Sequence, residues 1–161
     1  MSTKERYQYF KPISWGQFHK DAKELAQRLI DKGPFKGIVA ITRGGLMPAG
    51  IVARELEIRL IETMCIVSYD WVEQGETCKV IKGVEGSGEG WLIIDDLVDT
   101  GRTAELVRQT LPKAYFATVY AKPSGKTKVD LFIEEFSQDT WVLFPWDAEM
   151  QFVPPLGSGR K

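Results

Sequence analysis

The sequence predicts a doubly wound α/β domain built on a mostly parallel β-sheet. Short apolar runs rich in β-branched residues, typical of buried parallel strands, alternate with segments whose apolar residues recur at helical spacing. Glycine-containing turns follow several of these runs, at points where a strand leads into a helix. Sheets of this class bind ligands at the carboxyl ends of their strands, so we expect the functional residues in these turns.

The predicted elements follow this alternation along the chain. Segment 15–30 is predicted to be a helix, because apolar residues recur on one face and Ser14 can cap its start. Gly33 and Pro34 end it, and Pro48 suits the first turn of the next helix. The remaining expected elements are, in order, strand 37–41, helix 48–56, strand 60–68, a strand-like piece at 78–81, strand 91–94, helix 104–110 and strand 115–121.

Length and composition limit the classes of function. With 161 residues the chain has the size of a single domain with one core. Its formal net charge of −1 provides no basic field to attract nucleic acid. The polar opening is unlike a secretory signal and no apolar run has the length that spans a bilayer, so a cytoplasmic location is expected. Cys65 and Cys78 lack metal-ligand spacing and are expected to be reduced thiols.

Segment 91–104 predicts a site for a phosphorylated sugar. An apolar strand precedes Asp95 and Asp96, and a turn rich in Thr and Gly follows Asp99 and opens into a helix. Unpaired N–H groups at the start of a helix favour an anion. The carboxylates would repel a bare phosphate, so the ligand must also offer hydroxyl donors or a divalent cation. A ribose 5-phosphate with Mg²⁺ meets both demands.

Three further segments lie after predicted strands. Thr42, Arg43, Gly44 and Gly45 follow strand 37–41, where glycine permits close approach of the backbone and the guanidinium can bind two diphosphate oxygens. Lys122 follows strand 115–121. Aromatic residues gather near a carboxylate in segment 141–147 and could stack on a base.

Segment 91–104 resembles the signature of the type I phosphoribosyltransferases, in which two acids follow a hydrophobic strand and a Thr-Gly-x-Thr loop closes the site. Together with the other segments, the similarity extends over 36–155 and resembles the 6-oxopurine branch of that family. The resemblance implies a Mg²⁺-dependent transfer of the 5-phosphoribosyl group from 5-phospho-α-D-ribose 1-diphosphate (PRPP) to guanine or xanthine. Pyrophosphate and a nucleoside monophosphate would be the products.

The resemblance also implies roles for individual residues. The pyrophosphate loop would be Thr42, Arg43, Gly44 and Gly45, with a cis peptide bond before Arg43. The ribose and its 5-phosphate would be held by Asp95, Asp96, Asp99, Thr100, Gly101, Arg102 and Thr103, with Asp99 as the general base facing N7 of the purine. The purine would also contact Lys122, Trp141 and Val142, and the metal would lie near Asp95, Asp96 and Asp147.

Segment 68–82 is predicted to be a lid. It is polar, too long for a tight turn, and its Ser68-Tyr69 pair resembles the start of the loop that family members close over the site. Family members tend to place an arginine in this loop, and this chain does not. Lys79 could provide the missing charge.

The predicted organisation is one domain over 1–161, with a core at about 36–125, a hood made by the N- and C-terminal segments, and the lid. Two alternatives remain beside the main interpretation: a preference for hypoxanthine and guanine, and an RNA-binding regulator of the same fold, against which the near-neutral charge argues. The resemblance alone implies a homo-oligomer, commonly a tetramer, and for some bacterial members a peripheral association with the inner membrane.

Overall fold

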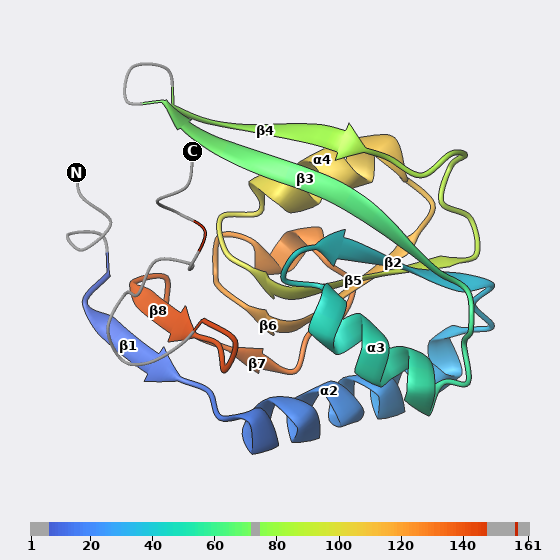
Figure 1. Cartoon of the computed structure of the whole chain (residues 1–161), viewed down its shortest axis with the longest axis horizontal. Helices are drawn as coiled ribbons and strands as arrows, with labels where there is room; N and C mark the ends of the chain where they lie inside the picture. Colours follow the sequence, from blue (N-terminus) through green and yellow to red (C-terminus); the bar gives the residue numbers. More distant parts are fainter. Residues whose placement is uncertain (1–6, 72–74, 148–156, 158–161) are drawn as a thin grey trace.

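The computed structural model describes residues 7–71, 75–147 and 157, and a twisted six-stranded sheet forms its centre (Figure 1). The strand order is β4-β3-β2-β5-β6-β7; β3 and β4 pair antiparallel and all other neighbours pair parallel. The strands are β2 (Gly37–Thr42), β3 (Ile61–Trp71), β4 (Gly75–Lys82), β5 (Trp91–Val98), β6 (Tyr115–Ala121) and β7 (Glu134–Glu135). The α/β class with a mostly parallel sheet is therefore confirmed.

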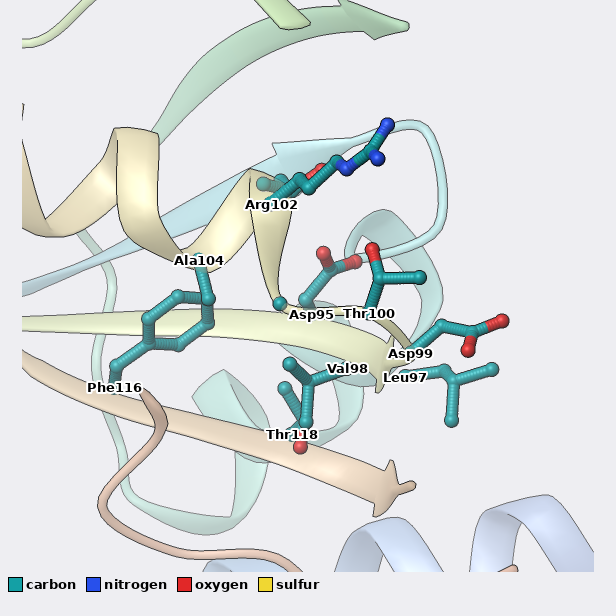
Figure 2. A pocket seen from close by; sticks show the side chains of 11 residues that line it. Asp95, Leu97, Val98, Asp99, Thr100, Arg102, Ala104, Phe116 and Thr118 are labelled. Carbon is teal, nitrogen blue, oxygen red and sulfur yellow. The ribbon is translucent and has the colours of Figure 1, made fainter. Parts of the chain in front are cut away.

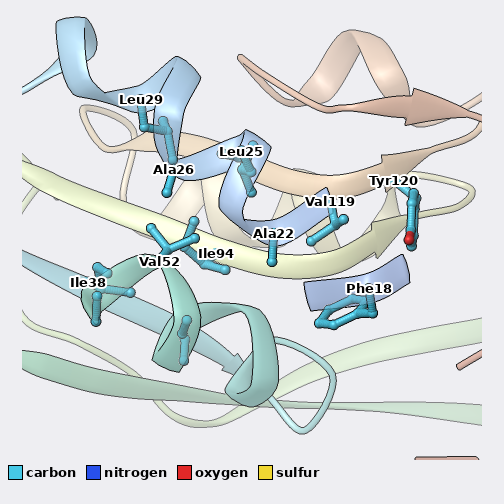
Figure 3. Packing of buried hydrophobic residues seen from close by; sticks show 14 of the residues in the cluster. Phe18, Ala22, Leu25, Ala26, Leu29, Ile38, Val52, Ile94, Val119 and Tyr120 are labelled. Carbon is cyan, nitrogen blue, oxygen red and sulfur yellow. The ribbon is translucent and has the colours of Figure 1, made fainter. Parts of the chain in front are cut away.

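Helices cover both faces of the sheet and enclose two apolar clusters. On one face, α2 (Trp15–Leu29) and α3 (Leu46–Glu55) bury side chains such as Leu25 and Val52 against Ile38 and Ile94 (Figure 3). On the other face, α4 (Arg102–Thr110) buries Val107 against the alternate residues of the same strands. This arrangement follows from the strand period of two, which sends successive side chains to opposite faces. Short 3₁₀ turns, η1 (Ile30–Lys32) and η2 (Lys126–Lys128), complete the helical elements described.

A second, two-stranded sheet lies beside the central one. It pairs β1 (Tyr9–Pro12) in parallel with β8 (Thr140–Leu143), so it joins the two segments from which a hood is expected. An aromatic group under this small sheet connects it to α2: Trp146 stacks on Phe144 with ring centroids 4.7 Å apart, and both rings contact Phe18 edge-on. The small sheet is thereby fixed beside the carboxyl ends of the central strands (Figure 1).

Several element boundaries differ from the prediction. Helix α3 begins at Leu46 and α4 at Arg102, each two residues before its predicted start. Strand β5 continues through Asp95 and Asp96 to Val98, because the backbone of Asp95, Leu97 and Val98 still pairs with β6. Segment 68–82, predicted as a polar lid with a strand-like piece at 78–81, forms most of an antiparallel hairpin of β3 and β4, in which Ser68 pairs with Cys78, so both strands are longer than predicted. The predicted N-cap of α2 is confirmed: the Ser14 hydroxyl accepts a hydrogen bond from the Gln17 N–H at 3.1 Å.

Cys65 and Cys78 are not joined by a disulfide bond in the structure. A search of the described helices found none with the length and apolar character needed to cross a bilayer.

Candidate active site

The carboxyl ends of β2, β5 and β6 lie next to one another in the sheet and bring the predicted site segments together. Strand β5 pairs with β2 on one side and with β6 on the other, in the same direction. The loops that follow these strands therefore open at one edge of the sheet (Figure 1). These are 42–45 after β2 and 99–103 after β5, and Lys122 follows β6. The structure thus confirms that the three segments converge.

The loop after β2 is packed closely against β5. The peptide bond between Thr42 and Arg43 is cis, as expected. Gly45 donates its N–H to the Ile41 carbonyl at 2.7 Å, and a Cβ on Gly45 would lie 2.4 Å from the Ile94 carbonyl oxygen. A Cβ on Gly44 would lie 2.4 Å from a carboxylate oxygen of Asp96. Only glycine can therefore hold this loop in contact with the acidic pair.

Asp95 and Asp96 form a half-buried carboxylate pair at the end of β5. Asp95 Oδ1 accepts the Asp96 N–H at 2.9 Å and Asp96 Oδ1 accepts the Leu97 N–H at 2.7 Å, so the backbone orients both groups. Burial raises the pKa of Asp95 well above its ordinary value, and the charge of Asp96 raises it further. Burial also raises the pKa of Asp96 to about 6, with an additional contribution from the charge of Asp147. The pair is therefore costly to ionise without a cation or donors beside it.

The chemistry of this pair fits Mg²⁺ bound together with a substrate. The part of the chain that the structure describes contains no group of three or more His, Cys, Asp or Glu side chains that could hold a metal ion by themselves. Mg²⁺ is usually bound through one or two carboxylates, waters and substrate phosphates, and not by an all-protein cage. Asp147, whose carboxylate accepts the Phe144 N–H at 3.2 Å, places a third negative charge near Asp96.

A cavity follows the acidic pair, at the start of α4. Backbone and side chains of 97–104 line it together with Phe116 and Thr118, and Arg102 and Phe116 lie on opposite sides of it (Figure 2). Gly101 has φ +86° and caps α4, and a Cβ there would collide with the Lys128 side chain at 2.7 Å. The cavity lies at the N-terminal turn of α4, and the unpaired N–H groups at the start of a helix favour a bound phosphate.

Asp99 and Lys122 meet beside this cavity. The Lys122 ammonium, on a side chain that is 1% exposed, donates to Asp99 Oδ2 at 2.9 Å. Gln138 Nε2 donates to the other oxygen, Asp99 Oδ1, at 2.7 Å, while Gln138 Oε1 accepts the Ser124 N–H at 2.9 Å. Tyr7 also donates its hydroxyl to Asp99 Oδ2, at 3.2 Å. An acid and a buried cation are therefore held side by side at the edge of the sheet.

Comparison with known proteins decides the family. Residues 14–152 match the model of the phosphoribosyl transferase domain. The chain belongs to the phosphoribosyltransferase family. Over 156 residues it is 65% identical to a xanthine-guanine phosphoribosyltransferase of Nitratidesulfovibrio vulgaris (strain DP4), covering 97% of this chain and 96% of the relative. A protein of the same name from Desulfotalea psychrophila is 63% identical over 152 residues, covering 94% of this chain and 95% of the relative.

Solved structures show the same phosphoribosyltransferase fold. A purine phosphoribosyltransferase from Pyrococcus horikoshii superposes with a TM-score of 0.75 at 24% identity, covering 90% of this chain and 98% of that one. A xanthine-guanine-hypoxanthine phosphoribosyltransferase from Helicobacter pylori gives a TM-score of 0.70 at 24% identity, covering 86% and 94%. At this identity the likeness concerns the fold alone.

Some site residues predicted for a phosphoribosyltransferase lie apart from this edge or outside the described positions. Lys79 is exposed on β4, and among the residues described it takes no part in the contacts that join the acids, Lys122 and Gln138. The backbones of Ser68 and Tyr69 pair within β3 and β4, and their side chains are outside the described residues. Trp141, by contrast, lies near this edge, because it contacts Tyr7 edge-on, with ring centroids 4.9 Å apart, and Tyr7 donates to Asp99. Val142 is buried in the same strand, β8.

Gln138 and Tyr7 also contact Asp99, and neither was predicted from the sequence. Gln138 is 39 positions from Asp99 and Tyr7 is 92 positions from it, and each stands in a polar stretch without a motif. Gln138 bridges the Ser124 backbone and Asp99, so it fixes the carboxylate that faces Lys122. Only the folded arrangement of the phosphoribosyltransferase domain shows these contacts.

Gly44→Ala is expected to weaken PRPP binding about 10- to 100-fold with a smaller effect on folding. The added methyl group would displace the Asp96 carboxylate, which would lose its hydrogen bond from the Leu97 N–H. Calorimetric titration with Mg²⁺ and PRPP measures the effect. Gly50→Ala is the matched control, because a Cβ there meets nothing within 4 Å and alanine favours the helix by about 1 kcal/mol. If Gly44→Ala bound PRPP as tightly as the wild type, the close contact between Gly44 and Asp96 would have no role in PRPP binding.

Proposed function

We propose that the enzyme is a xanthine-guanine phosphoribosyltransferase of purine salvage. It transfers the 5-phosphoribosyl group from PRPP to N9 of guanine or xanthine, and hypoxanthine less well, giving GMP or XMP and pyrophosphate. The single observation that carries the choice of a 6-oxopurine is the buried Lys122 ammonium beside Asp99 at the open edge of the sheet. The names of the relatives at 63% and 65% identity support the same activity.

The charges that develop in the reaction explain the placement of the loops. As the C1–O bond of PRPP breaks, positive charge develops on the ribose and negative charge on the pyrophosphate. Asp95 and Asp96 hold the ribose hydroxyls, while Arg43 and the N–H groups of 42–45 hold the pyrophosphate. The loop of Thr100, Gly101, Arg102 and Thr103 holds the 5-phosphate at the start of α4. Because Gly44 touches Asp96, the two loops act on one substrate.

Asp95 and Asp96 would hold the Mg²⁺ that enters with PRPP, with Asp147 nearby. When bound, the cation neutralises charge on the pyrophosphate and makes it a better leaving group. The carboxylates orient the ribose hydroxyls at the same time, since their backbone hydrogen bonds fix both groups at the strand end.

Asp99 and Lys122 would read the base. The Lys122 ammonium can only donate, so it favours a keto oxygen at C6 over the amino group of adenine. Asp99 would accept or return the N7 proton as N9 becomes the nucleophile. Trp141 would stack on the purine, and the backbone of Val142 would bind its edge.

The β3–β4 hairpin would act as the lid, with Lys79 as a flexible charge in place of the missing arginine. We also propose a cytoplasmic homotetramer, which sedimentation equilibrium tests. Peripheral association with the inner membrane of bacteria is a further expectation of the resemblance, and flotation with anionic vesicles tests it. The alternative of an RNA-binding regulator predicts salt-dependent RNA retention without PRPP turnover.

The decisive experiment compares initial rates on guanine, xanthine and hypoxanthine with saturating PRPP and Mg²⁺. We expect guanine and xanthine to be the better substrates. A clear preference for hypoxanthine over xanthine would favour the second candidate, a hypoxanthine-guanine enzyme. This candidate stays open because Lys122 would contact the group at C6, whereas the bases differ at C2. No nucleotide from any of the three bases would refute the proposed activity.

Lys122→Ala is expected to lower kcat/KM for guanine and xanthine alike, about 10- to 100-fold. A charged hydrogen bond to O6 would be lost, and Asp99 would lose a partner. Steady-state rates at varied base concentration measure the loss. Lys126→Ala is the control, because Lys126 forms a partly exposed ion pair with Glu135 and such pairs contribute about 0–1 kcal/mol. Intact kinetics on both bases would contradict the assignment to O6.

A further inference from the structure

Tyr7 touches three of the residues assigned to the base. Its hydroxyl donates to Asp99 Oδ2 at 3.2 Å. Its ring lies against the Lys122 ammonium, which is 4.6 Å from the ring centroid. Its ring also meets the Trp141 ring edge-on, with centroids 4.9 Å apart and planes at 69°. The motifs of the site do not include this tyrosine.

These contacts coincide with those that a 6-oxopurine needs. The base requires an aromatic partner, a donor at O6 and a carboxylate at N7, and Tyr7 presents an aromatic ring and a hydroxyl to the same three groups. Because the Tyr7 side chain already contacts Lys122, Asp99 and Trp141, a purine that approaches these three residues from the side of Tyr7 would have to displace it. The inference rests on the proposed function, since it takes these residues as the base site.

We propose that Tyr7 occupies the base pocket of the ligand-free enzyme and leaves it when the purine binds. The backbone directly after Tyr7 is fixed, because the N–H groups of Gln8 and Tyr9 donate to the Asp139 carbonyl at 2.9 and 3.2 Å and β1 follows. Tyr7 stands just before that anchor, so rotation of its side chain and its own backbone clears the pocket without breaking the small sheet. Only molecules in which Tyr7 has left the pocket can bind the base. The apparent association constant for the base is therefore the intrinsic one multiplied by the fraction of molecules that are open.

The test compares two ligands that differ only by the base. GMP and ribose 5-phosphate are titrated calorimetrically into the full-length wild type, Tyr7→Ala, Tyr7→Phe and the control Tyr9→Ala, whose side chain is exposed on β1. Tyr7→Ala is expected to bind GMP about tenfold more tightly than the wild type, with ribose 5-phosphate changed less than about twofold. Tyr7→Phe keeps the ring and loses the hydrogen bond to Asp99, so its GMP affinity should lie between those of the wild type and Tyr7→Ala. Tyr9→Ala should bind GMP like the wild type.

The outcomes separate this inference from the proposed function. Equal or weaker GMP binding by Tyr7→Ala, with ribose 5-phosphate binding unchanged, would overturn the inference. Tyr7 would then either have no effect on GMP binding or contribute to it. If Tyr7→Ala does not fold, Tyr7→Phe decides, because unimproved GMP binding in that variant also refutes the proposal. A wild type that binds neither ligand would refute the proposed function itself.

Discussion

Replacing Asp99 with Asn is expected to lower turnover about 10²- to 10³-fold while the affinity for PRPP stays within about twofold. A positioned general base contributes roughly 10²- to 10⁴-fold to a rate, and Asn cannot accept the N7 proton. In the proposed site the neighbouring loops and the acidic pair would hold PRPP, so we expect its binding not to require the Asp99 charge. Single-turnover rates with saturating guanine, beside calorimetric titration with PRPP, separate the two effects.

Asp99→Asn would also change the hydrogen bonds that Asp99 makes with its neighbours. Lys122 and Gln138 both donate to this carboxylate, so an Asn amide can accept from one of them and must turn its NH₂ toward the other. The buried Lys122 ammonium would also lose its charged partner. We therefore expect a lower Tm as well, which makes a stability measurement necessary beside the kinetics.

Asp130→Asn is the matched control for that variant. Asp130 pairs with Arg108 at 2.7 Å and accepts the Phe116 N–H at 2.8 Å, so Asp130→Asn removes a carboxylate and an ion pair while the hydrogen bonds of Asp99 stay intact. It should lower Tm modestly and leave kcat intact. Turnover of Asp99→Asn equal to that of the wild type would show that another group moves the proton.

Local sequence signals predicted the central elements because each depends on neighbouring residues. The apolar face of α2 and the cap at Ser14 are encoded within a few positions, and the structure places both as expected. The end of β5 was set too early because Asp95 and Asp96 interrupt the apolar run, while the main chain of Asp95 still pairs with Thr118 of β6. Backbone pairing between strands does not depend on side-chain polarity, so a pattern of polarity underestimates such a strand.

The full length of the β3–β4 hairpin was not predicted, for a related reason. Its outer strand β4 lies at an edge of the sheet, where polar side chains such as Lys79 and Lys82 face solvent and the alternation of apolar residues is weak. The loops of the site were predictable because each motif is contiguous in sequence. The contacts of Gln138 and Tyr7 with Asp99 were not, because they depend on how β1 and β8 pair.

The pH dependence of folding follows from the raised pKa values of the acidic pair. The pKa of Asp96 is about 6 in the folded protein, against an ordinary value of 3.8, so the folded state binds more protons than the unfolded state between these values. Stability of the ligand-free enzyme therefore falls as the pH rises from about 4 to 6. Asp95 acts in the same direction. Binding of Mg²⁺ and PRPP has the opposite dependence, since the site needs the ionised form, and its affinity should fall below about pH 6.

Asp96→Asn is accordingly expected to stabilise the ligand-free enzyme near neutral pH and to abolish productive binding of PRPP with Mg²⁺. One pKa unit corresponds to about 1.4 kcal/mol, so removing the buried charge should raise stability by up to about 3 kcal/mol, or Tm by roughly 5–10 °C. The gain should disappear near pH 4, where Asp96 is protonated in the wild type. Asn keeps an acceptor for the Leu97 N–H, so the strand end is preserved.

Thermal unfolding of wild type and Asp96→Asn across this pH range, with and without Mg²⁺ and PRPP, measures both effects. The ligands should raise the Tm of the wild type and leave that of the variant unchanged. Asp31→Asn, at an acid in the first turn of η1, is a control that should respond like the wild type. If Asp96→Asn were less stable than the wild type at neutral pH, the carboxylate would be a structural group and not one held ready for a cation. If the variant still gained stability from Mg²⁺ and PRPP as the wild type does, Asp96 would have no part in holding them.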